Sequence, residues 1–265
     1  MKTWLFAILE STIAIGGLAA WLWADNVLLA GAAAMTAAAL GVAQPIMAAR
    51  QAGRIARYQD EMFDASVESV DQEIAKLLDE VTFVPLPHRP TVAAVLHKAF
   101  PEEAESLIKQ YDRLVKAAID ESFAAEELAA AFADKIDDHP LALHMCGLAA
   151  MSQENLEEAH EYFLTVTERR PEWISPWLGW AATAWRLEQV EEISARHPHV
   201  NGVNLTPYDV GDEQTFIDLA EDERDALVEE FQQTARALGN FYTMAEYSKS
   251  KRQIESSREQ FRRAA

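Results

Sequence analysis

The feature that most constrains this chain is a spaced series of small and large side chains between residues 139 and 187. Gly147 is followed by Ala159 after twelve residues, by Phe163 four residues later and by Pro171 eight residues after that. Small residues allow two helices to approach closely, and a large ring fills the groove that neighbouring helices leave. Proline cannot continue a helix because it lacks the backbone N–H. The spacing therefore predicts a pair of closely packed antiparallel helices.

The same large-then-small pair occurs twice, 34 residues apart, as Leu143 with Gly147 and as Trp177 with Ala181. In these residues the segment 139–187 resembles the tetratricopeptide repeat (TPR) family, in which helix-turn-helix units recur at this period. The resemblance implies an all-α fold, an α-solenoid built from such units, and a function in binding other proteins. It does not name the partner.

The boundaries of the repeat region depart from the family pattern on both sides. Phe132 and Pro140 repeat the eight-residue spacing of Phe163 and Pro171, so residues 102–138 are a candidate degenerate repeat, although Leu128 stands where a small residue belongs. On the other side, Pro198 interrupts the returning helix of the second repeat. We therefore place a TPR-like domain at residues 91–200, followed by an irregular segment and two helices hinged at Gly239 in residues 201–265.

Two apolar runs of 21 residues each, 3–23 and 27–47, open the chain. Each is long enough to cross a bilayer core at 1.5 Å per residue. Residues 1–49 are therefore predicted to form a transmembrane helical hairpin, and the second, alanine-rich run is the weaker span. A cleaved signal peptide is the alternative. A connecting helix and a proline-rich break are predicted at residues 50–90.

The basic residues around the two runs set the predicted orientation. Lys2 precedes the first run, while Arg50, Arg54 and Arg57 follow the second. By the positive-inside rule both ends face the cytoplasm. This predicts a multi-pass protein of the inner (cytoplasmic) membrane with most of the chain on the cytoplasmic side.

One acidic residue, Glu10, lies inside the first run, where a charge is costly and usually has a partner. In an antiparallel hairpin its depth matches that of Gln44, which is the expected hydrogen-bond partner. Two roles are open for the Glu10 carboxyl. It is either protonated or directed toward the membrane surface, or it takes part in a proton or ion relay.

Composition excludes several functions. The net charge is −20 and falls almost entirely after residue 49, which argues against a nucleic-acid partner because phosphates require a basic surface. The single cysteine, Cys146, cannot form an intramolecular disulfide. No phosphate-binding loop, paired cysteines or zinc-protease motif is present. We therefore expect no enzyme activity, no cofactor and no metal.

The expected function is a membrane-anchored scaffold that binds a protein or peptide client through the concave face of its repeats. The alternative is an accessory or assembly subunit of a larger membrane protein complex, contacted mainly through the hairpin. In TPR proteins the first helix of each pair forms the concave face. By this resemblance the partner-binding residues are His144, Leu148, Met151, Ser152, Leu178, Ala182, Trp185 and Arg186.

The last seventeen residues, 249–265, form a basic tail with six basic and two acidic side chains. The acidic body and an anionic membrane surface compete for this tail. Since only two large apolar side chains accompany the basic residues, deep insertion into a membrane is disfavoured. We expect the tail to dock on its own protein or on a partner first.

Overall fold

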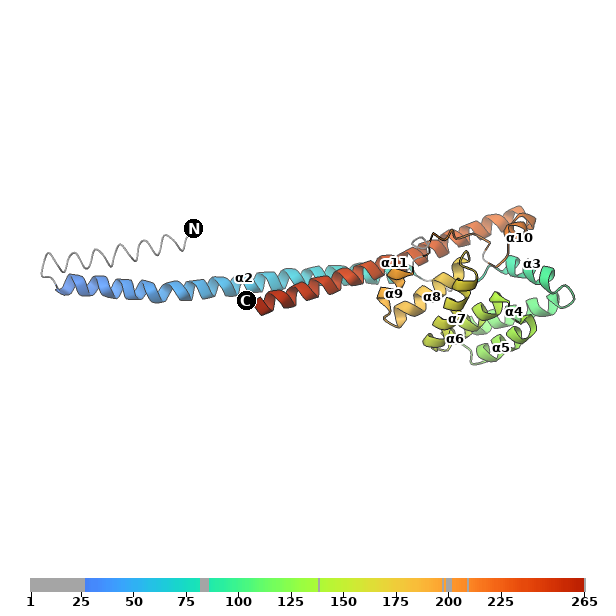
Figure 1. Cartoon of the computed structure of the whole chain (residues 1–265), viewed down its shortest axis with the longest axis horizontal. Coiled ribbons are helices and arrows are strands. Elements are labelled where there is room, and N and C mark those ends of the chain that lie inside the picture. The colour runs from blue at the N-terminus through green and yellow to red at the C-terminus, as the bar shows by residue number, and fades with distance from the viewer. Residues whose placement is uncertain are drawn as a thin grey trace. The chain divides into compact units, whose positions relative to one another are not determined.

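The computed structural model of the chain describes residues 27–81, 86–137, 139–196, 198, 202–208 and 210–264 (Figure 1). The chain divides into two compact units. Unit 1 contains residues 1–66 and 255–265, and unit 2 contains residues 67–254. The described residues form helices and no β-strand, which confirms the predicted all-α fold; one isolated backbone bridge joins Trp173 and Thr206.

The described residues contain ten helices, labelled α2–α11. Their bounds are α2 Val27–Glu80, α3 Arg89–Ala99, α4 Ala104–Ile119, α5 Ala124–Ile136, α6 Pro140–Ser152, α7 Leu156–Arg169, α8 Ile174–Arg186, α9 Val190–Ala195, α10 Glu213–Asp218 and α11 Glu221–Ala264. The apolar spacing and the prolines in the sequence predict helices at residues 48–81, 91–100, 102–121 and 123–136, and these correspond to α2 after its apolar start, α3, α4 and α5.

Three consecutive helical hairpins, α4–α5, α6–α7 and α8–α9, pack against one another in unit 2 (Figure 1). The first helix of each hairpin ends in the same turn, in which a glutamate has a positive φ: Glu121 at 51°, Glu154 at 63° and Glu188 at 59°. After each glutamate, the next backbone N–H donates to the carbonyl of an alanine five residues back, at distances of 2.9, 2.9 and 2.8 Å. This bond closes a Schellman-type helix end. The three hairpins therefore share one turn structure, at intervals of 33 and 34 residues.

Phe163 of α7 packs against the first helices of two hairpins, α6 and α8. Its buried ring lies against Gly147 of α6 and Gly179 of α8, where an added Cβ would approach ring carbons to 2.9 and 2.7 Å. Ala159 and Ala181, also predicted as small contact residues, are fully buried. The two glycines thus allow α6 and α8 to lie directly against one aromatic ring.

An extended segment at residues 86–88 joins α4, α8 and α11 of unit 2. The Tyr111 hydroxyl donates to the Pro87 carbonyl at 2.9 Å, and the Ser175 hydroxyl lies 3.5 Å from the Leu86 carbonyl. The guanidinium of Arg89 binds both carboxylate oxygens of Asp112 at 2.7 and 2.8 Å. This segment is part of the predicted proline-rich break, of which residues 82–85 lie outside the described part of the chain.

The predicted hinge at Gly239 is wrong, because α11 continues through it without interruption. Leu238 and Phe241 on either side are buried in the core, so tertiary packing holds this part of the helix. An exposed glycine inside a helix costs only about 1 kcal/mol relative to alanine. That cost is too small to end a helix that buries large side chains on both sides.

The basic tail is paired with acidic side chains of its own protein, one of the two docking sites predicted for it; the predicted preference over a membrane surface stays a prediction. In unit 2, Lys251 contacts Asp71 at 2.7 Å, and Arg252 pairs with Glu191. In unit 1, Arg258 contacts Asp60 at 3.1 Å and Asp64 at 2.6 Å, while Arg262 also contacts Asp60 at 3.1 Å. Lys249 and Arg263 pair with glutamates of their own helix.

The structure does not support the predicted membrane spans. Among the residues that the structure describes, none of the helices is both long and apolar enough to cross a membrane. This finding contradicts the multi-pass localisation in a cytoplasmic membrane. The second apolar run is the start of α2, where alanine contributes little to insertion and the helix continues into charged sequence. The first run, with Glu10, lies outside the described residues, as does the side chain of Gln44.

Candidate functional site

The predicted partner-binding residues fall into a buried and an accessible group. His144, Leu148 and Leu178, on the first helices α6 and α8, are each 1% exposed. His144 packs edge-to-face against the Phe163 ring, with centroids 5.4 Å apart. These three side chains belong to the core of unit 2 and present no surface to a partner.

The other five predicted residues lie at the C-terminal ends of α6 and α8 and reach the surface. Arg186 is exposed and pairs with Glu154 in the turn after α6. The remaining four are partly exposed: Met151, Ser152, Ala182 and Trp185. Of the predicted concave face, this end remains accessible.

A hollow that the sequence analysis did not predict lies between α5, α6 and α7. Its volume is about 240 Å³. Four of its lining residues are alanines, of which Ala130 is exposed and the other three are buried against the core of unit 2. The lining residues are Glu126, Ala129 and Ala130 of α5, Cys146, Ala149 and Ala150 of α6, and Glu158 and Tyr162 of α7.

Two contacts of the α6–α7 turn, one with α5 and one with the turn before α5, position one rim of the hollow. The Asn155 side-chain amide donates to Glu126 at 2.6 Å, and the Gln153 amide donates to the Ser122 carbonyl at 3.1 Å. The two donors flank Glu154, the left-handed residue of the shared turn. The turn geometry thus fixes where the Glu126 carboxylate lies.

The chemistry of the hollow is that of an acidic site with an apolar floor. Burial, followed by the charge of Glu158, raises the pKa of the Cys146 thiol, and burial also raises the pKa of Tyr162. Cys146 is therefore a neutral thiol at neutral pH and a poor nucleophile. Among the described residues, no basic side chain pairs with Glu126 or Glu158.

The sequence around the hollow is strongly acidic. Residues 120–162 contain eleven acidic residues and one basic residue, Lys135. Glu126 and Glu158 are exposed, as are their neighbours Glu127 and Glu157. A cation entering the hollow would thus meet a negative potential in addition to the two lining carboxylates.

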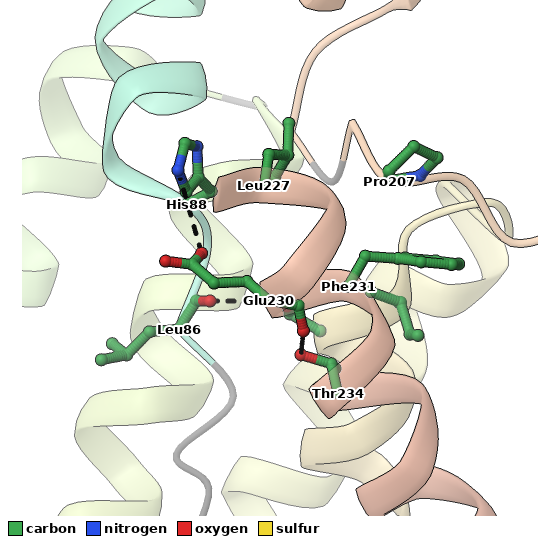
Figure 2. Close-up of a pocket in the computed structure, with 9 residues that line it drawn as sticks. Leu86, His88, Pro207, Leu227, Glu230, Phe231 and Thr234 are labelled. Atoms are coloured by element: carbon green, nitrogen blue, oxygen red, sulfur yellow. Dashed lines mark hydrogen bonds and ion pairs between the residues drawn. The ribbon is translucent and has the colours of Figure 1, made fainter. Parts of the chain in front are cut away.

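A second depression, shown in Figure 2, is a filled junction. It lies where the extended segment 86–88 meets α8 and α11, and its open volume is about 10 Å³. His88 Nε2 lies 3.9 Å from Glu230 Oε2, and the Thr234 hydroxyl donates to the Glu230 carbonyl at 2.8 Å. About 10–15 Å³ holds a single water molecule. The junction therefore contributes to the packing of unit 2 and cannot admit a ligand.

The buried histidines predict an acid-sensitive fold. Burial lowers the pKa of His88, against the opposing charges of Glu230 and Glu223, and burial also lowers the pKa of His139 and His160. The unfolded chain takes up these protons at a pH near 6.5, whereas the folded chain takes them up only at lower pH. Stability should therefore fall as the pH falls through about 6.5, and thermal unfolding at about pH 5.5 should occur at a lower temperature than at about pH 7.5.

A single substitution checks this pH effect. His139 Nδ1 accepts from the Leu141 N–H at 3.2 Å, an N-cap bond that a protonated Nδ1 cannot make. His139→Asn keeps an acceptor at the cap but does not titrate. Its melting temperature should depend less on pH than that of the wild type, and an unchanged pH dependence would contradict this assignment.

Groups of three or more metal-binding side chains are absent from the described residues. His197 and His199, which bracket Pro198, lie outside the described part of the chain.

Comparison with protein-family models, with curated proteins and with solved structures finds no match to this chain.

Proposed function

We propose that this chain is a helical-repeat scaffold of the tetratricopeptide type that binds a basic segment of a partner protein in the α5–α7 hollow. Three hairpins that share one turn structure support the repeat assignment. One observation carries the binding proposal, namely an apolar hollow lined by two carboxylates that no described basic residue neutralises.

The hollow suits a lysine or arginine side chain. At about 240 Å³ it is smaller than ligand pockets, which are commonly about 300–1,000 Å³. The methylene stem of a basic side chain packs on apolar surface while its charged head stays in a polar environment. Here the alanines would receive the stem, and Glu126 and Glu158 would receive the cation. The net charge of −20 would favour encounter with a basic partner.

We propose that the partner also contacts the accessible part of the predicted concave face. Trp185 is partly exposed and follows the accessible Ala182 on α8. A large aromatic side chain is a common anchor in protein interfaces. Trp185→Ala should therefore weaken the same partner without abolishing its binding.

Binding to the hollow is tested with substitutions that leave the core intact. Selection of random peptides on the full chain should enrich sequences with lysine or arginine. Ala130 is exposed and lines the hollow, so Ala130→Leu should block it and weaken the selected peptides by about tenfold or more. Ala131→Leu is the matched control, because Ala131 is exposed on the same helix and does not line the hollow.

A second pair of variants tests the charges. Glu126→Gln with Glu158→Gln should weaken binding, and the loss should be greatest at low salt. Glu127→Gln with Glu157→Gln removes the same charge from adjacent exposed positions and should have a smaller effect. Enriched peptides without basic residues, or full binding by Ala130→Leu, would refute the proposal.

A further inference from the structure

Helix α2 carries two rows of side chains in unit 1, on opposite sides. Gly53, Ala56, Asp60 and Phe63 are half-buried and recur at alternating intervals of three and four residues. This spacing is that of a coiled-coil seam. Asp60 in this row binds Arg258 and Arg262 of α11, so this side of α2 faces α11.

The second row begins two residues after the first and repeats its spacing. Ile55, Tyr58 and Met62 each follow a half-buried position by two residues, and two residues turn a helix by about 200°. Their exposures are 58%, 63% and 54%. A row of three large apolar side chains with seam spacing is thus exposed on the side of α2 that points away from α11.

The charges beside this second row are self-complementary. Residues 50–57 contain three arginines and no acid, whereas residues 60–68 contain four acids and no base, of which Asp60 and Asp64 pair with Arg258 of α11. Arg54 and Glu61 are both exposed and lie seven residues apart, so they occupy the same position beside the row. Gln59 lies on the other side of the row and carries no charge.

We propose that the exposed row binds a second copy of the chain in an antiparallel two-fold dimer centred near Tyr58. Antiparallel helices place equivalent flanking positions opposite each other, so Arg54 of each copy faces Glu61 of the other, and Ile55 packs near Met62. In a parallel pair, the side of the row that carries Arg54 in one copy would lie opposite the side that carries the uncharged Gln59 in the other copy. Charge complementarity therefore selects the antiparallel arrangement. This inference uses a surface of unit 1 and does not depend on the proposed peptide site.

The first test is self-association of the full chain. Sedimentation velocity over a concentration series should show a reversible monomer–dimer equilibrium. Ile55→Ser with Met62→Ser should shift it to monomer, because both residues are exposed and their loss does not disturb the core. Ala130→Leu should leave it unchanged. A chain that stays monomeric throughout, or an equilibrium that the double variant does not alter, would overturn the proposal.

Cysteine cross-linking tests the orientation in a Cys146→Ser background. Tyr58→Cys should give a disulfide-linked dimer under mild oxidation. Ile55→Cys alone should not, because in an antiparallel pair the two copies of residue 55 lie about 10 Å apart along the axis. A mixture of Ile55→Cys and Met62→Cys chains should cross-link. Efficient cross-linking of Ile55→Cys alone would indicate a parallel pair and would overturn the arrangement.

Exchanging the charges at positions 54 and 61 tests the proposed pairing of Arg54 with Glu61 between the two copies. Arg54→Glu should weaken dimerisation because it places two acids opposite each other, and Arg54→Glu with Glu61→Arg should restore it. Failure of the double variant to recover the dimer would contradict the assigned pairing.

Discussion

Replacing Phe163 by alanine should lower the free energy of unfolding by about 3–5 kcal/mol. The ring is fully buried and lies between two glycines, so no neighbouring side chain at Gly147 or Gly179 can relax into the space. It also supports His144, whose ring packs edge-to-face on it. Urea unfolding of the full chain, followed by far-ultraviolet circular dichroism, measures the loss.

An exposed phenylalanine provides the control. Phe123, at the start of α5, is 93% exposed, so Phe123→Ala should change the free energy of unfolding by less than about 0.5 kcal/mol. If Phe163→Ala cost no more than Phe123→Ala, Phe163 could not be the residue that locks α6, α7 and α8 together.

The helices were predictable because their signals are local. The apolar spacing after residue 48 predicts α2, and Pro101 and Pro171 separate neighbouring helices. The hinge predicted at Gly239 was wrong because glycine weakens a helix by only about 1 kcal/mol. The sequence does not show that the residues on either side of Gly239 are buried. The outcome there depends on long-range packing, which no local pattern records.

The accessible site was less predictable than the fold. The repeat resemblance assigns His144, Leu148 and Leu178 to a concave face, yet all three lie in the core. Periodicity shows which face of a helix is apolar, but it does not show what covers that face. A core built from segments far apart in the chain decides which part of the predicted face stays open.

The hollow was missed because its lining comes from three helices. Ala129 with Ala130 and Ala149 with Ala150 are visible as small pairs in the sequence, and small residues usually mark close helix contact. Here they line a hollow together with side chains of α7. Only the tertiary arrangement separates these two outcomes.

Three glycine-to-alanine substitutions should change the free energy of unfolding in different directions. At Gly179 a Cβ would lie 2.7 Å from the buried Phe163 ring, and at Gly147 it would lie 2.9 Å from it, so Gly179→Ala and Gly147→Ala should each cost about 1–3 kcal/mol by overpacking. Gly239 has open space around the added atom and an ordinary helical backbone. Gly239→Ala should therefore stabilise the chain by about 0.5–1 kcal/mol.

A double variant identifies the atoms responsible. Phe163→Leu removes the ring that the new Cβ would meet, so Gly179→Ala should cost less in the Phe163→Leu background than in the wild type. Because the two residues are in contact, their effects should not add, and the coupling should be about 0.5–3 kcal/mol in urea unfolding. Purely additive costs would show that Gly179 is required for another reason, such as the helix backbone itself, and would contradict the interlocking of α7 and α8 through Phe163.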